Sequence, residues 1–92
     1  MELRQLRYFL TVAQELNITR AAERLNMSQP PLSNQIRGLE EELGVTLFVR
    51  GKRRLTLTEE GSFLLQRAAQ LLDLEDKTRQ ELTTMKDGIS GK

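Results

Sequence analysis

Apolar residues near the start of the chain recur at intervals of three and four positions, the spacing of one face of an α-helix. This pattern predicts a first helix from about Leu3 to Leu16. A second, shorter helix is predicted from Ile18 to Leu25, because Asn17 is a residue type that caps helix amino termini. The first stripe consists of Leu6, Phe9, Leu10, Ala13 and Leu16, and the second of Ala21, Ala22 and Leu25.

A tight connection at Asn26-Met27 is expected to lead into a third helix, with Ser28 as its amino-terminal cap. Pro30 and Pro31 fit the first turn of this helix, because the backbone N–H groups there have no partner within the helix. Gly44 is suited to end the helix in a left-handed conformation. The predicted buried stripe has spacings of four, three and four and consists of Leu32, Ile36, Leu39 and Leu43.

Two short β-prone runs follow, Leu47–Arg50 and Leu55–Leu57, and the basic tip Gly51–Arg54 separates them. This arrangement predicts a small hairpin. Thr58 is the expected cap of a last helix, which continues for roughly 30 residues to about Met85.

The apolar stripe of the last helix is too long to be buried against so small a domain. Its outer portion is therefore expected to pack against another helix, and a second copy of the chain is the simplest candidate. Glu75 and Thr78 interrupt the stripe, so no long, regular coiled coil is expected. The tail Asp87–Lys92 is expected to be frayed, as at the cut end of a longer protein. The stripe consists of Gly61, Leu64, Ala68, Leu71, Glu75, Thr78, Leu82, Met85 and Ile89.

Together these elements predict a mainly α-helical chain in two parts. Residues 1–57 would form a winged helix-turn-helix, with three helices and a two-stranded wing. Residues 58–92 would form a linker or dimerisation helix with a frayed tail.

The composition excludes some kinds of site but does not identify a function. A chain of 92 residues buries a modest core, and its lack of cysteine and histidine removes disulfides and the usual zinc ligands. We therefore expect no metal and no cofactor, and a partner chain as the remaining stabiliser. No stretch approaches the roughly 20 apolar residues of a membrane span, and the start lacks the apolar run of a signal peptide. These features predict a cytoplasmic protein.

Charge is unevenly distributed along the chain. The net charge is +1, but residues 1–57 carry nine basic and six acidic side chains, a net charge of +3, and the remainder carries −2. The first part is thus the one suited to a polyanion such as DNA. The wing is the strongest indication, because Arg50, Lys52, Arg53 and Arg54 place four positive charges within five residues.

The outer face of the third helix carries groups that can read a DNA major groove. Gln29 and Asn34 can each bond bidentately to adenine, and Arg37 can reach guanine or a phosphate. Ser33 can serve a base or a phosphate, and Pro30 offers an apolar surface to a thymine methyl group. The alternative interpretation of this face is an ordinary solvated helix surface.

The basic hairpin can contact phosphate or a narrow minor groove. Its alternative interpretation is a charged turn that blunts a sheet edge. A polar-faced helix followed by a basic hairpin, in this order, is typical of a winged helix-turn-helix and favours DNA binding.

The sequence resembles the amino-terminal domain of LysR-type transcriptional regulators from Met1 to about Gly61, and the following helix is similar to their linker helix. The motifs that carry the resemblance are Leu6-Arg7-Tyr8-Phe9, Thr19-Arg20-Ala21-Ala22-Glu23-Arg24-Leu25, Ser28-Gln29-Pro30-Pro31-Leu32-Ser33, Ile36, Leu39-Glu40, Leu43-Gly44, Leu47-Phe48, Arg50 and Leu57-Thr58-Glu59-Glu60-Gly61.

This resemblance implies a bacterial homodimer that binds an interrupted inverted repeat in double-stranded DNA. It also implies a carboxy-terminal effector-binding domain, absent from this sequence, through which a small molecule acts and tetramers form. Many members have an arginine where this sequence has the shorter, uncharged Asn34. By position, the base-reading residues would be Gln29, Pro30, Ser33 and Asn34, the backbone contacts Thr19, Ser28 and Arg37, the wing contacts Arg50, Arg53 and Arg54, and the dimerisation residues Leu64, Ala68, Leu71, Leu82 and Met85.

The sequence leaves two other classes of function open. A helical adaptor would use the long last helix to capture protein and would leave DNA untouched. An enzyme is the weakest hypothesis, because the chain lacks the commonest acid–base and nucleophilic groups. The carboxylates of Glu40, Glu41 and Glu42 are of the type that binds metals, but three consecutive side chains fan out around a helix, which predicts a solvated face.

Overall fold

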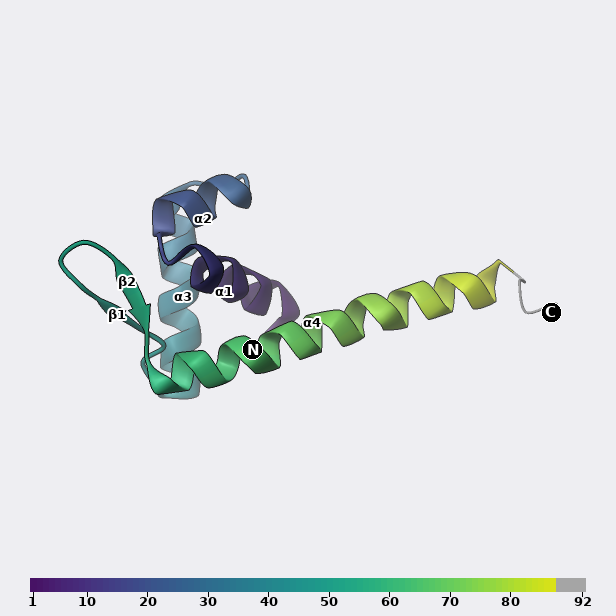
Figure 1. Cartoon of the computed structure of the whole chain (residues 1–92). Coiled ribbons are helices and arrows are strands. Elements are labelled where there is room, and N and C mark those ends of the chain that lie inside the picture. The colour runs from purple at the N-terminus through teal and green to yellow at the C-terminus, as the bar shows by residue number, and fades with distance from the viewer. Residues whose placement is uncertain (88–92) are drawn as a thin grey trace.

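The computed structural model describes residues 1–87, in which the elements follow one another in the predicted order. The predicted fold class, three helices with a two-stranded wing and a long last helix, is confirmed (Figure 1). The predicted frayed tail lies outside the described residues except for Asp87. The elements are α1 (Leu3–Glu15), α2 (Ile18–Arg24), α3 (Gln29–Leu43), β1 (Phe48–Arg50), β2 (Leu55–Leu57) and α4 (Glu59–Lys86).

The turn between α2 and α3 owes its shape to Asn26. This residue has φ 54°, in the left-handed region that asparagine adopts more readily than most residues. The N–H of Met27 donates to the carbonyl of Ala22 at 3.0 Å, and that of Asn26 donates to Glu23 at 3.2 Å. These two bonds close the carboxyl end of α2 and turn the chain sharply. The predicted tight connection is therefore confirmed.

The three short helices enclose one apolar core around Phe9, which is fully buried. The ring of Phe9 meets that of Phe48 with centroids 5.4 Å apart, so the core reaches the start of the wing. The predicted stripe of α3 is confirmed for its first three members, Leu32, Ile36 and Leu39. It is wrong for Leu43, which is 38% exposed because it lies at the very end of the helix.

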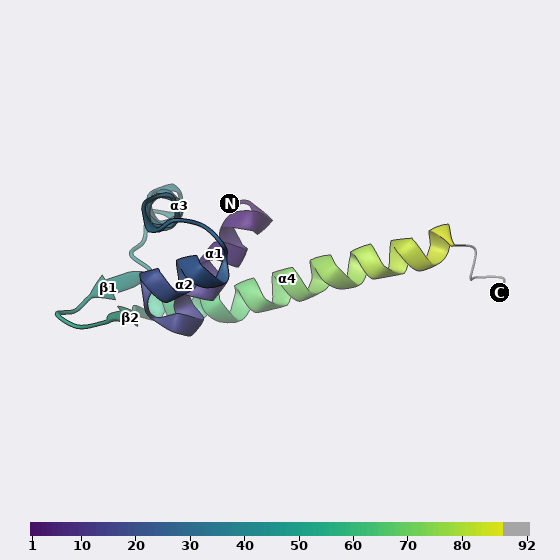
Figure 2. The same ribbon diagram turned by 90° about the horizontal axis from the view of Figure 1, so that it is seen from above.

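The first half of α4 belongs to this same core. Gly61, Leu64, Ala68 and Leu72 are buried, and α4 packs chiefly against α1. The boundary predicted after residue 57 therefore does not mark a break in packing. The second half of α4 extends beyond the three short helices (Figures 1 and 2). None of the helices within residues 1–87 is both long and apolar enough to span a membrane.

The start of α4 is bonded to the segment that enters β1. The hydroxyl of Thr58 accepts from the N–H of Gly61 at 2.9 Å, which confirms the predicted cap, and donates to the carbonyl of Thr46 at 2.6 Å. The N–H of Thr58 donates to the carbonyl of Leu47 at 3.0 Å. A Cβ added to Gly61 would lie 2.2 Å from that same carbonyl oxygen. Only glycine allows the helix to approach this closely.

We predict that Gly61→Ala lowers the free energy of unfolding by about 1–3 kcal/mol, because the added methyl forces α4 away from Leu47. Urea unfolding followed by circular dichroism measures the change. Gly38→Ala is the matched control: its Cβ would lie 3.8 Å from the nearest side-chain atom, so it should stabilise the helix by about 0.5–1 kcal/mol. Equal stability of Gly61→Ala and the native chain would contradict the close-approach argument.

Candidate nucleic-acid interface

Helix α3 presents its first residues to solvent. Gln29 is the first residue of the helix, and Pro30 and Pro31 occupy its first turn, as predicted. Gln29, Pro30 and Asn34 are exposed, whereas Ser33 is half-buried and so less available to a ligand. Ser28 occupies the cap position, but its side chain makes no capping hydrogen bond. The predicted cap position is therefore confirmed, but the hydroxyl does not bond to the helix and lies exposed at its amino-terminal end.

Two of the predicted contact residues on α3 are bonded to each other. Nη1 of Arg37 donates to Oδ1 of Asn34 at 3.2 Å. Residues three apart on a helix lie side by side, which brings these two side chains into reach. The contact uses one of the two lone pairs of the Asn34 carbonyl and leaves the amide nitrogen able to donate.

The wing is a short antiparallel ribbon whose tip projects away from the helices (Figures 1 and 2). Arg50 pairs with Leu55 in the ladder, and the N–H of Gly51 donates to the carbonyl of Arg54 at 2.9 Å. A Cβ on Gly51 would lie 2.9 Å from that carbonyl oxygen, so the tight tip requires glycine. Within residues 1–87, no ion pair neutralises Arg50, Lys52, Arg53 or Arg54.

A polar cleft of about 310 Å³ lies between the start of α2, the start of α3 and the wing. It brings together residues predicted for all three DNA-contact roles: Gln29 for bases, Thr19 for the backbone, and Arg50, Arg53 and Arg54 for the wing.

A neighbouring cleft of about 130 Å³ between α3 and the wing is lined by Ser33, Arg37 and Arg50 among others. Ser28, Pro30 and Asn34 line neither cleft. The site therefore consists of an open helix face beside a positively charged slot.

Glu40 holds the wing next to α3. Its Oε2 accepts from the N–H of Leu47 at 2.7 Å and from that of Phe48 at 3.2 Å, and its backbone carbonyl accepts from Gly44 and Val45. The prediction that Glu40 lies on a solvated face is wrong, although Glu41 and Glu42 are exposed. Sequence reasoning missed this role because the partner N–H groups are backbone atoms, which leave no sequence signal beyond an acidic residue near the helix end.

The predicted dimerisation residues fall into two groups. Leu64 and Ala68 are buried in the chain's own core, so they are not open to a second copy. Leu71, Leu82 and Met85 are exposed, and so are two residues that the stripe did not include, Phe63 and Leu74. An apolar groove of about 440 Å³ runs along this face and is lined by Leu3, Leu71, Leu74, Glu75, Thr78, Arg79 and Leu82.

Comparison with known proteins settles the family. Residues 3–62 match the family described as "Bacterial regulatory helix-turn-helix protein, lysR family". The chain belongs to this family. It is 49% identical over 92 residues to the HTH-type transcriptional regulator BsdA of Bacillus subtilis, covering 99% of this chain and 32% of BsdA. The chain spans 24–32% of the first curated relatives that it matches, all of them transcriptional regulators.

Solved structures of LysR-family domains share the whole described fold. The DNA-binding domain of BenM, in complex with benA site 1 DNA, matches with a TM-score of 0.92 and 46% identity over 96% of this chain and 99% of that one. The DNA-binding domain of CbnR, also in complex with DNA, matches with a TM-score of 0.89 and 40% identity over 92% of this chain and 98% of that one.

We predict that Glu40→Ala lowers the free energy of unfolding by about 1–3 kcal/mol, because two backbone N–H groups lose a charged acceptor. Chemical unfolding measures this. Glu41→Ala removes an exposed carboxylate from the same helix and should change stability by less than about 0.5 kcal/mol. If the two variants were equally stable, the attachment of the wing through Glu40 would be refuted.

Proposed function

We propose that this chain is the DNA-binding domain of a bacterial LysR-type transcriptional regulator. It would act as a homodimer on an interrupted inverted repeat, with α3 in the major groove and the wing on flanking backbone or minor groove. The observation that carries this proposal is the cleft in which Gln29, at the start of α3, faces the basic wing. The alternative, an ordinary solvated helix face, does not account for the four positive charges of the wing beside it, which no ion pair within residues 1–87 neutralises.

The first turns of α3 are the part that enters the groove. In helix-turn-helix proteins the amino-terminal residues of the motif's second helix, which is α3 here, contact base edges. The major groove that admits this helix is about 12 Å wide. Gln29, Pro30, Ser33 and Asn34 are the base-reading residues of this proposal. Arg37 bonds to the Asn34 carbonyl and so orients the Asn34 amide, which keeps a second lone pair and its N–H donors for a base.

Phosphate contacts surround this reading face. The exposed hydroxyls of Thr19 and Ser28 and the guanidinium of Arg37 are proposed to hold the DNA backbone. Arg50, Arg53 and Arg54 are proposed as wing contacts, because an anion would relieve their mutual repulsion. Supporting this arrangement, the BenM and CbnR domains of the same fold were solved as DNA complexes.

The exposed face of α4 is proposed to bind a second copy in the antiparallel direction. Phe63 lies eight residues before Leu71, and Leu82 lies eight residues after Leu74. A two-fold axis between Leu71 and Leu74 would therefore place Phe63 of one helix opposite Leu82 of the other.

Charge supports the same orientation. Glu59 lies twelve residues before Leu71 and Lys86 twelve residues after Leu74, so the antiparallel register pairs opposite charges at each end. A parallel pair would place like charges together. The antiparallel dimer also sets the two reading domains at opposite ends, as an interrupted repeat requires.

The remaining aspects of the proposal follow from this role. The chain would act by binding rather than by catalysis, in the cytoplasm and without a cofactor. A small-molecule effector would act through the carboxy-terminal domain that lies outside this chain.

We predict that affinity for DNA falls steeply with salt, and that two substitutions act differently. Gln29→Ala should cost about 1–3 kcal/mol and relax base preference without changing the salt dependence. Arg53→Ala should weaken all sequences alike and reduce the slope of log affinity against log salt by about 1, because it removes one phosphate contact. The duplexes are first selected from random DNA by the native domain and then labelled with a fluorophore. Titrating them with each variant at several salt concentrations measures the affinity.

An affinity for DNA that does not change with salt concentration would exclude the DNA-binding proposal and favour a protein adaptor. If both variants lost affinity equally for every sequence, Gln29 would not be a base reader. Sedimentation with and without the selected duplex distinguishes the adaptor directly, since an adaptor would leave the DNA unbound.

We predict that Leu74→Glu dissociates the dimer, because it places a charge at the centre of the apolar interface in both copies. The loss should exceed about 2 kcal/mol, since burial of one leucine contributes roughly 1.5–3 kcal/mol. Leu74 is 61% exposed in the single chain, so the helix content should not change. Ala69→Glu is the matched control, exposed on the opposite side of α4. Sedimentation equilibrium that showed equal dimerisation of the two variants would contradict this interface.

A further inference from the structure

Among residues 1–87, polar contacts join helix α4 to other elements at two places. The near place is its first turn, where Thr58 is bonded to Thr46 and Leu47. The far place is Glu75, one turn beyond Leu72, the last buried residue of the helix. Within residues 1–87, no hydrogen bond or ion pair joins α4 beyond Glu75 to another element. Glu75 is therefore the outermost polar attachment of α4.

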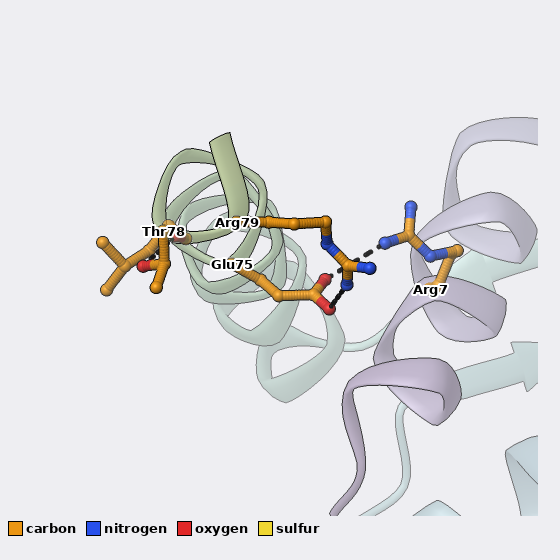
Figure 3. Close-up of polar contacts among 5 residues, drawn as sticks. Arg7, Glu75, Thr78 and Arg79 are labelled. Atoms are coloured by element: carbon orange, nitrogen blue, oxygen red, sulfur yellow. Dashed lines mark hydrogen bonds and ion pairs between the residues drawn. The ribbon is translucent and has the colours of Figure 1, made fainter. Parts of the chain in front are cut away.

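The carboxylate of Glu75 contacts two arginines on different helices (Figure 3). Its Oε1 accepts from Nη2 of Arg7 on α1 at 3.3 Å, and its Oε2 accepts from Nη2 of Arg79 on α4 at 2.6 Å. The side chain of Glu75 is 23% exposed, whereas those of Arg7 and Arg79 are 49% and 71% exposed. The two oxygens of the carboxylate thus accept from different helices, one from α1 and the other from α4 itself.

This contact lies where α4 leaves the core. Leu72 is the last buried residue of the helix, and Glu75 follows it by three residues, or about 4.5 Å of helix. A small tilt of α4 about its buried part would thus displace the helix most beyond Glu75. Leu82 and Met85, two of the exposed residues that the proposed dimer would bury, lie past this point. The proposed register places Leu82 of one chain opposite Phe63 of the other, so the direction of α4 beyond Glu75 decides where the second reading domain lies.

We propose that Glu75 is a positioning residue that sets the distance between the two DNA half-sites. Through Arg7 it biases the angle between the reading domain and the part of α4 beyond Leu72. This inference rests on the proposed function, because it requires a dimer with two reading helices. An exposed ion pair contributes at most about 1 kcal/mol, so the contact biases the angle rather than locking it.

The test compares DNA spacings within each variant. The probe is the duplex of highest affinity that the native domain selects from random DNA, together with versions carrying one base pair more or one fewer at its centre. We expect the native domain to prefer the selected spacing, and Glu75→Ala to reduce that preference roughly two- to fivefold. The protein concentration is kept above the dissociation constant of the dimer. The ratio of affinities for two spacings then does not depend on dimer stability.

The matched control is Asp73→Ala, which removes an exposed carboxylate and its ion pair with Lys77 from the same helix without touching α1. It should keep the native spacing preference. Arg7→Ala should reproduce the effect of Glu75→Ala, and the double variant should show no further loss, because both changes remove one contact.

A second readout needs no DNA. The chain has no cysteine, so Glu41→Cys introduces a single exposed site for a spin label on α3. The distance distribution between the two labels of a dimer should broaden in Glu75→Ala and stay narrow in Asp73→Ala.

The outcomes separate this inference from the proposal beneath it. A native domain that selects no duplex, or shows no spacing preference, would overturn the two-half-site function itself. A native domain with a clear preference, unchanged in Glu75→Ala and with equally narrow distance distributions, would overturn only the role of Glu75.

Discussion

Leu47 is the residue at which the reading helix, the wing and the long helix are joined. Its N–H donates to the carboxylate of Glu40 on α3, and its carbonyl accepts from Thr58 at the start of α4. Its side chain is buried in the same core as Phe9. Gly61 lets α4 approach this peptide closely enough for the contacts to form. The relative positions of all functional surfaces depend on this short stretch.

The DNA-facing surface depends on that joint because it is assembled from separate elements. The wing is only three residues long in each strand, too short to be stable by itself. Glu40 and the Phe9–Phe48 contact anchor its base, and its four positive charges are then held beside the start of α3. A charged tip without these anchors would turn away into solvent. An anion in the cleft would relieve the repulsion that the anchors maintain.

Helix α4 combines two roles because its two faces differ. One face completes the core through Gly61, Leu64, Ala68 and Leu72, and the other leaves large apolar side chains exposed. Both faces belong to one continuous helix. A change in the direction of α4 therefore moves the reading domain and the proposed dimer surface together. The contact of Glu75 with Arg7 lies where these two roles meet.

The order and limits of the elements were predictable from sequence, because helical spacing, Asn17 and Thr58 as caps, and Gly44 with φ 70° act over a few neighbouring residues. The residues around the cleft were predictable as candidates for the same reason, together with the family motifs. Which residues of the α4 stripe face inward was decided by tertiary structure, since the 3,4 spacing cannot tell a core from a partner helix. Burial of Leu64 and exposure of Phe63 and Leu74 depend on where α1 lies. The bonds of Glu40 and Glu75 likewise join groups distant in sequence, which only the packed fold brings within reach.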